Sequence, residues 1–242
     1  MTQNSTKLTF KRYETKYLLT AEQFDALWQR LRDRVQPDEY FRSTVCSIYY
    51  DSSDFDLIRR SLDGPVYKEK LRLRSYGVPD RDSTVFVELK KKYKGIVYKR
   101  RITMTEQEAE RYLSGQAPAP EQSQVSREID WFLKQHQPEA RVLIACDREA
   151  YVASENNELR FTFDKHIRWR ENELCLCSGD AGEELLENDM VLMEIKLPEA
   201  APVWLAELLS ELEIFPRGFS KYGTCYKNKL IEKYFDGVIE IA

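Results

Sequence analysis

Two stretches of sequence decide the fold: Tyr67-Lys68-Glu69-Lys70-Leu71-Arg72-Leu73-Arg74 and Val85-Phe86-Val87-Glu88-Leu89-Lys90-Lys91-Lys92. Successive side chains of a β-strand point to opposite faces of the sheet. In the first stretch, every even position from 68 to 74 is a lysine or an arginine, and in the second the even positions 88, 90 and 92 are charged. Most odd positions are aliphatic. The alternation therefore predicts two strands with one apolar face and one cationic face.

Four other candidate strands repeat the alternation. The charged positions that share a face are Arg12, Glu14 and Lys16; Lys99 and Arg101; Arg160, Thr162 and Asp164; and Glu194 and Lys196. An antiparallel sheet with one face in water would explain any one of these strands. Six strands that repeat lysine or arginine, most of them with one carboxylate, favour instead a charged face that lines a binding site.

The overall composition conceals a strong charge asymmetry. The 242 residues include 37 Lys+Arg and 41 Asp+Glu, for a net charge of −4. Residues 59–101 alone hold 14 basic and 5 acidic residues, a balance of +9, so the rest of the chain carries −13. An acidic chain is atypical of general nucleic-acid coat proteins, which are basic as a whole. A concentrated basic segment indicates a local site for an anion.

The sequence also constrains the class of protein and its compartment. Hydrophobic residues make up 42% of the chain, enough for a core, and we expect a single domain over residues 1–242. No apolar run approaches the roughly 20 residues of a membrane-spanning helix, and residues 1–10 lack the apolar centre of a signal peptide. Five cysteines without C-x-x-C spacing favour reduced thiols. We therefore expect a cytoplasmic protein with no membrane span.

The element pattern predicts an α+β fold. Helices are expected over residues 20–35, 54–62, 105–115, 123–136, 202–212 and 220–235, and strands over 9–18, 44–50, 67–76, 84–92, 96–103, 141–151, 159–165 and 190–197, with a ninth candidate at 167–177. Thr20 with Gln23, and Thr105 with Glu108, have the spacing of capping boxes. Eight or nine strands interrupted by helices indicate an antiparallel sheet or an eight-stranded β-barrel with helices packed outside.

The charged faces have a chemical consequence in such a barrel. A barrel of about eight strands has an interior wide enough for one small ligand. If the apolar faces meet the helices, the charged faces line the interior, and so many cations call for a polyanion. A few carboxylates among cations suit a hard divalent ion, because Mg2+ and Mn2+ take oxygen ligands from one or two carboxylates and from phosphate.

Seven segments, in order along nearly the whole chain, resemble the motifs of the VTC (vacuolar transporter chaperone) domain of the CYTH, or triphosphate tunnel metalloenzyme, superfamily. They are RYETKY (12–17), KLRLR (70–74), FVELK (86–90), CDREAY (146–151), LRFTFD (159–164), MEIK (193–196) and FSKY (219–222). The first strand of the superfamily usually reads E-x-E-x-K. Here Arg12 replaces the first glutamate while Glu14 and Lys16 are kept, a departure that we expect of the VTC branch.

The resemblance implies a tunnel of eight antiparallel strands and the activity of a polyphosphate polymerase. VTC-like domains move the γ-phosphate of ATP onto a growing polyphosphate chain with a divalent metal, Mn2+ being favoured over Mg2+. The expected ligands are therefore ATP and polyphosphate or triphosphate, and not nucleic acid. Eukaryotic catalytic subunits add an SPX regulatory domain and membrane helices. This sequence shows neither, so any membrane partner is expected to be a separate protein.

In phosphoryl transfer, a protein chiefly positions the reacting groups and stabilises the charge on the transferring phosphoryl group. The candidate catalytic cations are Lys16, Arg72, Arg74, Lys90, Arg148, Arg160 and Lys221, and the further candidates for substrate binding are Arg12, Lys70, Lys99, Arg101 and Lys196. Arginines can fork onto phosphate oxygens, whereas lysines act as point charges. Glu194 is the first choice for a metal ligand, with Glu14 and Glu88 as carboxylates that assist it or orient cations.

Other functions fit the same residues. If water replaced the phosphate acceptor, the site would be a metal-dependent triphosphatase or nucleoside triphosphatase. A non-catalytic polyphosphate or nucleotide sensor would keep the cations but could dispense with a metal-binding carboxylate. The presence of Glu194 therefore favours an enzyme. An RNA-binding sheet would place aromatic residues beside the cations on the same face, and the strongest strands place other charges there. Arg100 competes with Arg101 if the register slips by one residue.

Several residues are left outside the expected site. Tyr67, Tyr93 and Tyr98 are candidates to flank an entrance where a nucleobase stacks. His136 and His166 belong to no motif, and the segment Cys175-Leu176-Cys177 is expected to be alternate residues of a strand.

Overall fold

The computed structural model describes residues 13–94, 96–187, 189–197 and 200–235, and the chain divides into two compact units. The first unit comprises the chain up to Arg42 together with Arg148–Lys165 and Glu187–Phe219. The second comprises Ser43–Asp147, His166–Leu186 and the chain from Ser220 onward. The chain passes between the units within three long strands and in two loop segments. That the whole chain is one domain stays a prediction.

The strands form one sheet of nine strands with the hydrogen-bonded order β1-β9-β7-β6-β2-β3-β4-β5, and β8 pairs with β7. Their bounds are β1 Tyr13–Leu19, β2 Val35–Asp51, β3 Tyr67–Tyr76, β4 Thr84–Tyr93, β5 Ile96–Thr105, β6 Glu139–Ala153, β7 Arg160–Arg170, β8 Glu183–Glu184 and β9 Val191–Leu197. The pairs β1–β9, β9–β7, β2–β3, β3–β4 and β4–β5 are antiparallel. The predicted antiparallel sheet is confirmed.

The helices are α1 Ala21–Leu31, α2 Asp56–Leu62, α3 Glu106–Leu113, α4 Gln124–His136, α5 Val203–Glu211, α6 Lys221–Cys225 and α7 Ile231–Phe235. Short 3-10 turns are η1 Arg32–Arg34 and η2 Leu176–Ser178, and the π-helical segment η3 Tyr226–Leu230 joins α6 to α7. Both predicted capping boxes are present, at Thr20 with Gln23 and at Thr105 with Glu108. Within the described residues, no helix combines the length and the apolar character that crossing a membrane requires.

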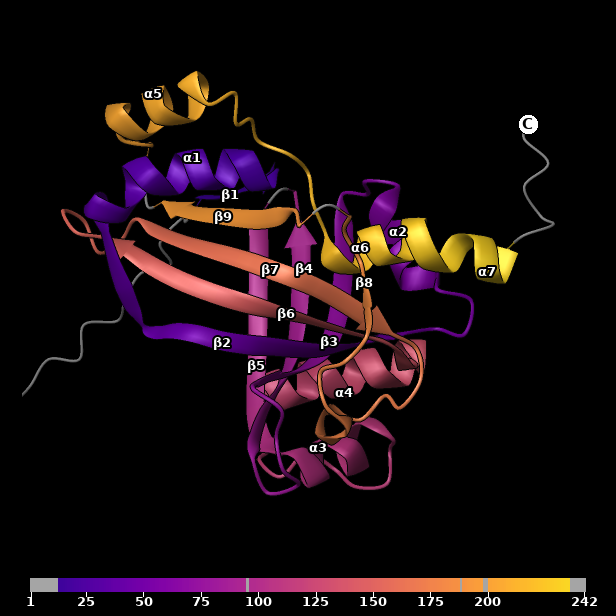
Figure 1. Ribbon diagram of the computed structural model, residues 1–242. Coiled ribbons are helices and arrows are strands. Elements are labelled where there is room, and N and C mark those ends of the chain that lie inside the picture. The colour runs from indigo at the N-terminus through magenta and orange to yellow at the C-terminus, as the bar shows by residue number, and fades with distance from the viewer. Residues whose placement is uncertain (1–12, 95, 188, 198–199, 236–242) are drawn as a thin grey trace, which may run out of the picture. The chain divides into compact units, whose positions relative to one another are not determined.

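In the first unit, α1 and α5 cover the apolar face of β1, β9 and β7 (Figure 1). The core combines side chains from helices and strands: Leu27 and Leu31 of α1 pack with Phe161 and Phe163 of β7 and Met193 of β9. Burial of each such side chain contributes about 1.5–3 kcal/mol. Because the apolar side chains of β9 point to these helices, Glu194 and Lys196 must point to the other face.

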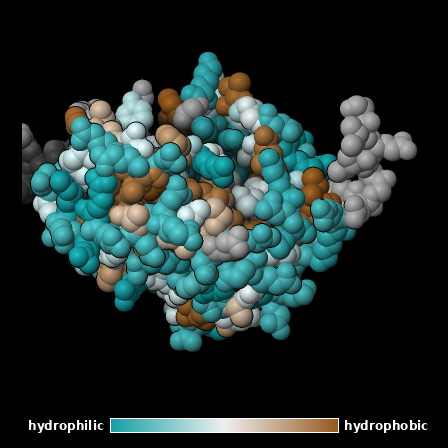
Figure 2. Space-filling model, turned by 45° about the horizontal axis from the view of Figure 1, so that its top comes forward, coloured by the Kyte–Doolittle hydropathy of each residue, from teal (hydrophilic) through white to brown (hydrophobic). Residues whose placement is uncertain are grey.

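In the second unit, α3 and α4 pack against the sheet formed by β3, β4 and β5 (Figure 1). Leu71 of β3 and Leu89 of β4 are fully buried against Ile129 and Phe132 of α4. The even-numbered residues of β3 and β4 therefore face away from the helices. The prediction of helices packed on the apolar face of the sheet is confirmed within each unit. Most of the molecular face seen in Figure 2 consists of hydrophilic residues, consistent with the high content of charged residues.

A buried carboxylate fixes the helices at the end of β2. Asp51 accepts hydrogen bonds from the backbone nitrogens of Leu57 (2.9 Å) and Ile58 (3.0 Å) in α2, and from the hydroxyl of Tyr222 in α6 (2.9 Å). Burial raises the pKa of Asp51, against the lowering effect of these donors. One side chain therefore ties α2 and α6 to the sheet.

Two element predictions are wrong. The helix expected over residues 20–35 ends at Leu31, and after one 3-10 turn Val35 already begins β2, nine residues before the expected strand. Pro37 lies in this early part of β2. The separate ninth strand at 167–177 does not form, because β7 continues through His166 to Arg170 and residues 171–177 leave the sheet. Residues 9–12 of the first expected strand lie outside the described part.

Candidate functional site

The strand registers align the charged residues of the second unit in rows across the sheet. Arg72 of β3, Glu88 of β4 and Arg101 of β5 are direct neighbours. The adjacent row consists of Lys70, Lys90 and Lys99. Directly opposite residues of neighbouring strands lie within reach of each other's side chains. The alternation predicted this common face, and the registers confirm it.

Glu88 lies at the centre of four cations, which with Glu88 we call the Glu88 cluster. Its Oε2 atom lies 2.6 Å from Nη2 of Arg72 and 3.9 Å from Nη1 of Arg74. Its Oε1 atom lies 2.9 Å from Nζ of Lys99 and accepts a 2.8 Å hydrogen bond from Nε of Arg101. Both carboxylate oxygens are therefore engaged by cations.

The Glu88 cluster is strongly positive. Four cations around one carboxylate leave a local charge of +3, and Lys70 and Lys90 in the adjacent row add to it. The side chain of Glu88 is only 1% exposed. Burial acts to raise its pKa, but the charges of Arg72, Arg74 and Lys99 outweigh burial and lower the pKa. Glu88 is therefore ionised at neutral pH and orients the cations without neutralising them.

Further predicted cations of the second unit contact the same region of the sheet or the start of α6. Nζ of Lys70 donates to Oγ of Ser220 over 3.0 Å, and Nζ of Lys221 lies 3.0 Å from Sγ of Cys146. The ring of Tyr222 stacks on Tyr49 at 4.7 Å between centroids, and Tyr49 in turn lies opposite Arg72. The FSKY segment thus brings Lys221 to the unit that carries the Glu88 cluster.

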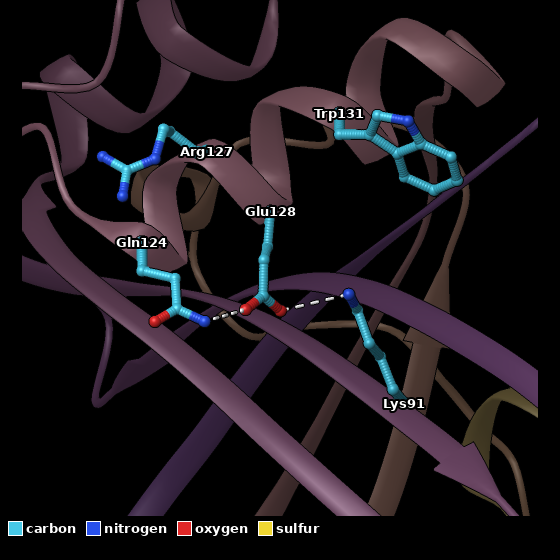
Figure 3. A pocket seen from close by; sticks show the side chains of 5 residues that line it. All are labelled: Lys91, Gln124, Arg127, Glu128 and Trp131. Atoms are coloured by element: carbon cyan, nitrogen blue, oxygen red, sulfur yellow. Dashed lines mark hydrogen bonds and ion pairs between the residues drawn. The ribbon is translucent and has the colours of Figure 1, made fainter.

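The opposite face of the same strands carries a separate pocket, of about 310 Å³, lined by Lys91, Gln124, Arg127, Glu128 and Trp131 (Figure 3). Glu128 of α4 lies 3.1 Å from Nζ of Lys91 and 3.5 Å from Nε of Arg100. Arg100 therefore faces α4, whereas Arg101 faces Glu88. The register does not slip, and the predicted assignment of Arg101 to the charged face holds.

The first unit has a second set of rows on β1, β9 and β7. Lys16, Glu194 and Thr162 form one row, and Glu14, Lys196 and Arg160 form the next. We call these six residues, with Arg148 and Asp164, the Glu194 cluster. Nζ of Lys16 lies 3.1 Å from Oε1 of Glu194 and 3.9 Å from Oε1 of Glu14.

Glu194 is a mostly buried carboxylate with a strongly lowered pKa. Its side chain is 12% exposed, and Oε2 lies 3.8 Å from Nζ of Lys196. Burial acts to raise the pKa of Glu194, but the charges of Lys16, Arg148 and Lys196 outweigh it and lower the pKa to about 2. Nζ of Lys16 also donates to the carbonyl of Phe219 over 3.2 Å. Glu194 is therefore ionised throughout the physiological range.

Two predicted cations of the first unit are engaged by carboxylates. Arg148 binds Asp164 in a bidentate pair, Nε to Oδ1 at 2.6 Å and Nη2 to Oδ2 at 2.7 Å, and Asp164 is fully buried. Arg160 is half exposed, with Nη1 3.6 Å from Oδ2 of Asp38. Arg12 lies outside the described residues.

The donor set of the Glu194 cluster fits a hard divalent ion. Mg2+ and Mn2+ are bound through one or two carboxylates, with phosphate oxygens and water completing the shell. Glu194 and Glu14 supply two carboxylates on one face, both ionically paired with Lys16. Glu88 fits less well, since Arg72, Arg101 and Lys99 lie within 2.9 Å of its oxygens, whereas the nearest cation to Glu194 among the described residues is Lys16 at 3.1 Å. The Glu88 cluster thus has an excess of positive charge, and the Glu194 cluster offers carboxylate oxygens.

Some contributing residues were missed from the sequence. Asp164 was placed on the charged face by alternation, but nothing in the sequence indicated that it would hold Arg148. Asp51 and Tyr49 carry no motif, and only the pairing of β2 with β3 brings Tyr49 to Arg72. His136 and His166 pair with Glu69 and Asp147, away from Glu88 and Glu194. Tyr67, Tyr93 and Tyr98 are exposed on β3, β4 and β5.

Comparisons with known proteins show the family and the fold of the chain. The family model of the VTC domain matches residues 11–229. No curated protein matches the chain. Among solved structures, a candidate adenylate cyclase from Bacillus halodurans is similar over 92% of this chain and 96% of its own, with a TM-score of 0.54 and 19% identity. This likeness shows a shared fold.

Two further solved structures are more distant. A protein from Pyrococcus horikoshii OT3 is 13% identical, with a TM-score of 0.47, over 90% of this chain and all of its own. A candidate adenylate cyclase from Vibrio parahaemolyticus is 12% identical, with a TM-score of 0.44, over 88% of this chain and 96% of its own.

Proposed function

Because this chain belongs to the VTC domain family, we propose that it is a metal-dependent polyphosphate polymerase. It would move the γ-phosphate of ATP onto the end of a growing polyphosphate chain. The observation that carries this proposal is the Glu88 cluster, where four cations surround one buried carboxylate and leave a charge of +3. Fixed cations in excess over their counter-charge are suited to a ligand that brings several negative charges close together.

The residues divide into distinct roles in this proposal. Arg72 and Arg101 present planar guanidinium groups that can fork onto phosphate oxygens, while Lys70, Lys90 and Lys99 act as point charges along the next row. Glu88 holds the cations in place before the ligand arrives, which avoids reorganisation during the reaction. Lys16, Arg74, Arg148, Arg160, Lys196 and Lys221 stay candidate phosphate contacts, as does Arg12.

The chemical step needs no protein nucleophile. An oxygen of the terminal phosphate of the acceptor attacks the γ-phosphorus of ATP in line, the bond from that phosphorus to the β–γ bridging oxygen breaks, and ADP leaves. The acceptor gains one phosphate. Charge that builds up on the transferring phosphoryl group is stabilised by the fixed arginines and lysines.

Glu194, with Glu14, would hold the metal ion, Mn2+ or Mg2+. When bound, such an ion neutralises charge on the phosphate oxygens and orients them. Lys16 contacts both carboxylates and offsets part of their negative charge. A cytoplasmic location, ATP and polyphosphate as ligands, and a separate membrane partner for the product belong to the same proposal.

One experiment separates the polymerase from its alternatives. The purified protein is incubated with ATP and Mn2+, and both long-chain polyphosphate and free phosphate are measured. Polymer with stoichiometric ADP supports the proposal. Free phosphate from ATP or triphosphate without polymer would make the protein a triphosphatase, and binding without turnover would make it a sensor.

Variants of the first unit test the metal assignment in the same assay. Glu194→Ala should abolish turnover while the protein stays folded. Glu211→Ala is the matched control, because Glu211 is an exposed glutamate of the same unit that pairs only with Arg30 among the described contacts. Full activity of Glu194→Ala would refute the assignment of Glu194 as metal ligand.

A further inference from the structure

A group of metal-binding side chains lies in the second unit and belongs to neither cluster. Glu106 is the first residue of α3, and Cys175 and Cys177 flank the first residue of η2. The ligand atoms of these three residues all lie within 4.8 Å of one another. No other group of three histidine, cysteine or acidic side chains lies this close in the described part of the chain.

The spacing of these atoms suits a tetrahedral ion. Zinc binds sulfur at about 2.3 Å and carboxylate oxygen at about 2.0–2.2 Å, so tetrahedral ligand atoms lie about 3.5–3.8 Å apart. Sγ of Cys175 lies 3.4 Å from Oε1 of Glu106. The two thiolates are soft donors that suit zinc, unlike the oxygen-only ligands of Glu194 and Glu14.

The carboxylate of the group is held in position by Arg81. Glu106 is only 2% exposed, and its Oε2 accepts a hydrogen bond from Nη1 of Arg81 over 2.8 Å. Its other oxygen, Oε1, is the one that faces Cys175. Outer partners of this kind orient metal ligands and are common around metal sites. Arg81 also offsets the net charge of −1 that two thiolates, a carboxylate and a divalent ion carry together.

The cysteine loop is shaped before any ion binds. Leu176, between the two cysteines, is fully buried in the core of the second unit and anchors the turn. At the end of β7, Arg170 donates to the carbonyls of Asn172 (3.1 Å) and Ala181 (2.7 Å), and its Nη2 also donates to the carbonyls of Glu173 and Cys175. This loop is not the strand that the sequence predicted, and its shape brings both thiols to Glu106.

We propose that Cys175, Cys177 and Glu106 bind one zinc ion, with the fourth position left to water. Binding displaces the protons of the two thiols. The ion links the loop after β7 to the start of α3, so it stabilises the fold independently of the phosphate chemistry of the Glu88 and Glu194 clusters.

Cobalt provides the direct test, because Co2+ replaces Zn2+ in tetrahedral sites and reports thiolate ligation by a charge-transfer band in the near ultraviolet. The full chain, freed of metal with a chelator and reduced, is titrated with Co2+ and then with Zn2+. We expect the band to saturate at one equivalent of Co2+ and to disappear on addition of Zn2+. Absence of the band at one equivalent would overturn the proposal.

Variants locate the site. Cys175→Ser and Cys177→Ser should each lose most of the band, and Glu106→Gln should weaken Co2+ affinity at least tenfold. Glu110→Gln is the matched control, since Glu110 also contacts Arg81 but lies outside the group. Cys225→Ala controls for the loss of a thiol elsewhere in the same unit. A band that survives the double cysteine variant would place the metal elsewhere.

Two measurements need no variant. Zinc should slow alkylation of Cys175 and Cys177 at least tenfold, as measured by mass spectrometry of the labelled peptides, with the rate at Cys225 unchanged. At a hundredfold excess over its Kd, zinc should raise the Tm by about 5–10 °C, as expected for an ion that binds only the folded chain. Equal alkylation rates with and without zinc would contradict the site.

Discussion

Arg72 and Glu88 lie directly opposite each other on β3 and β4, and both Nε (2.7 Å) and Nη2 (2.6 Å) of Arg72 contact the same oxygen of Glu88. The other oxygen is thereby left to Lys99 and Arg101 from β5. A single buried carboxylate thus sets the positions of cations from two neighbouring strands, which would otherwise repel one another.

Loss of this carboxylate should destabilise the protein strongly. Glu88→Gln keeps the shape of the side chain but leaves four cations without their counter-charge, and we expect a loss of about 3–5 kcal/mol in the free energy of unfolding. Urea denaturation measures this loss. Glu110→Gln, at a carboxylate that is 55% exposed, should cost less than about 1 kcal/mol.

Triphosphate in the buffer should restore part of the stability of Glu88→Gln, because the ligand would replace the missing negative charge. If the variant is as stable as the parent protein in the absence of phosphate, Glu88 does not organise the cluster.

Neighbouring arginines on β5 should differ in their effect on ligand binding. Arg101 faces Glu88, whereas Arg100 faces Glu128 of α4. Because a charge-assisted hydrogen bond contributes about 1.5–3 kcal/mol, Arg101→Ala should weaken triphosphate binding by roughly 10- to 100-fold. Arg100→Ala should leave the Kd within about twofold. Isothermal titration calorimetry measures both values, and equal losses would contradict the assignment of faces.

The lowered pKa of Glu194 should make the fold sensitive to acid. The ordinary pKa is 4.5 and the folded-state value is about 2, so the stabilisation is fully present above pH 4.5 and is lost as the pH falls toward 2. Over this window the free energy of unfolding of the parent protein should fall by up to about 1.4 kcal/mol per pH unit more than that of Glu194→Gln.

Urea midpoints between pH 4.5 and 2, in buffer with a chelator, test this difference. Glu211→Gln serves as control and should follow the parent protein, because its carboxylate is exposed. Parallel curves for the parent protein and Glu194→Gln would show that Glu194 has an ordinary pKa in the folded state.

Two ion pairs of the first unit should differ in their contributions to stability. Asp164→Asn breaks a buried bidentate pair and removes the carboxylate that binds Arg148, which should cost about 3–5 kcal/mol. Asp38→Asn breaks a longer pair with the half-exposed Arg160 and should cost less than about 1 kcal/mol. Thermal unfolding of the two variants, compared at one protein concentration, distinguishes these outcomes.

Strand alternation predicted the charged face well, since the same parity that turns Leu71 and Leu89 toward the helices must turn Arg72 and Glu88 to the other face of the sheet. The capping boxes also located the starts of α1 and α3. Both signals depend on residues that are close together in the sequence. Alternation fixes the face on which each side chain of a strand lies, and a capping box spans only four residues.

The contacts made within that face could not be predicted. The spacing of residues in the sequence does not indicate which cations contact Glu88 or that Arg148 pairs with Asp164. These contacts depend on which strands are neighbours and on side-chain rotamers. The sequence predicts a strand for the segment with Cys175 and Cys177, because its residues alternate. The shape of this loop depends on the contacts of Arg170 with four backbone carbonyls and on the burial of Leu176 in the core. Neither contact follows from the local sequence pattern.

The pairing of β1 with β9 has a consequence for how the chain is made. Lys16 lies opposite Glu194, which follows it by 178 residues. At a synthesis rate of about 5–20 residues per second, the first strand waits on the order of 10–35 seconds for its partner. During that time Tyr17 and Leu19, both buried in the finished protein, lie on a strand without its hydrogen-bonded neighbour. Completion of the first unit is therefore a late event in biosynthesis, and a nascent chain halted before residue 191 should depend on chaperones.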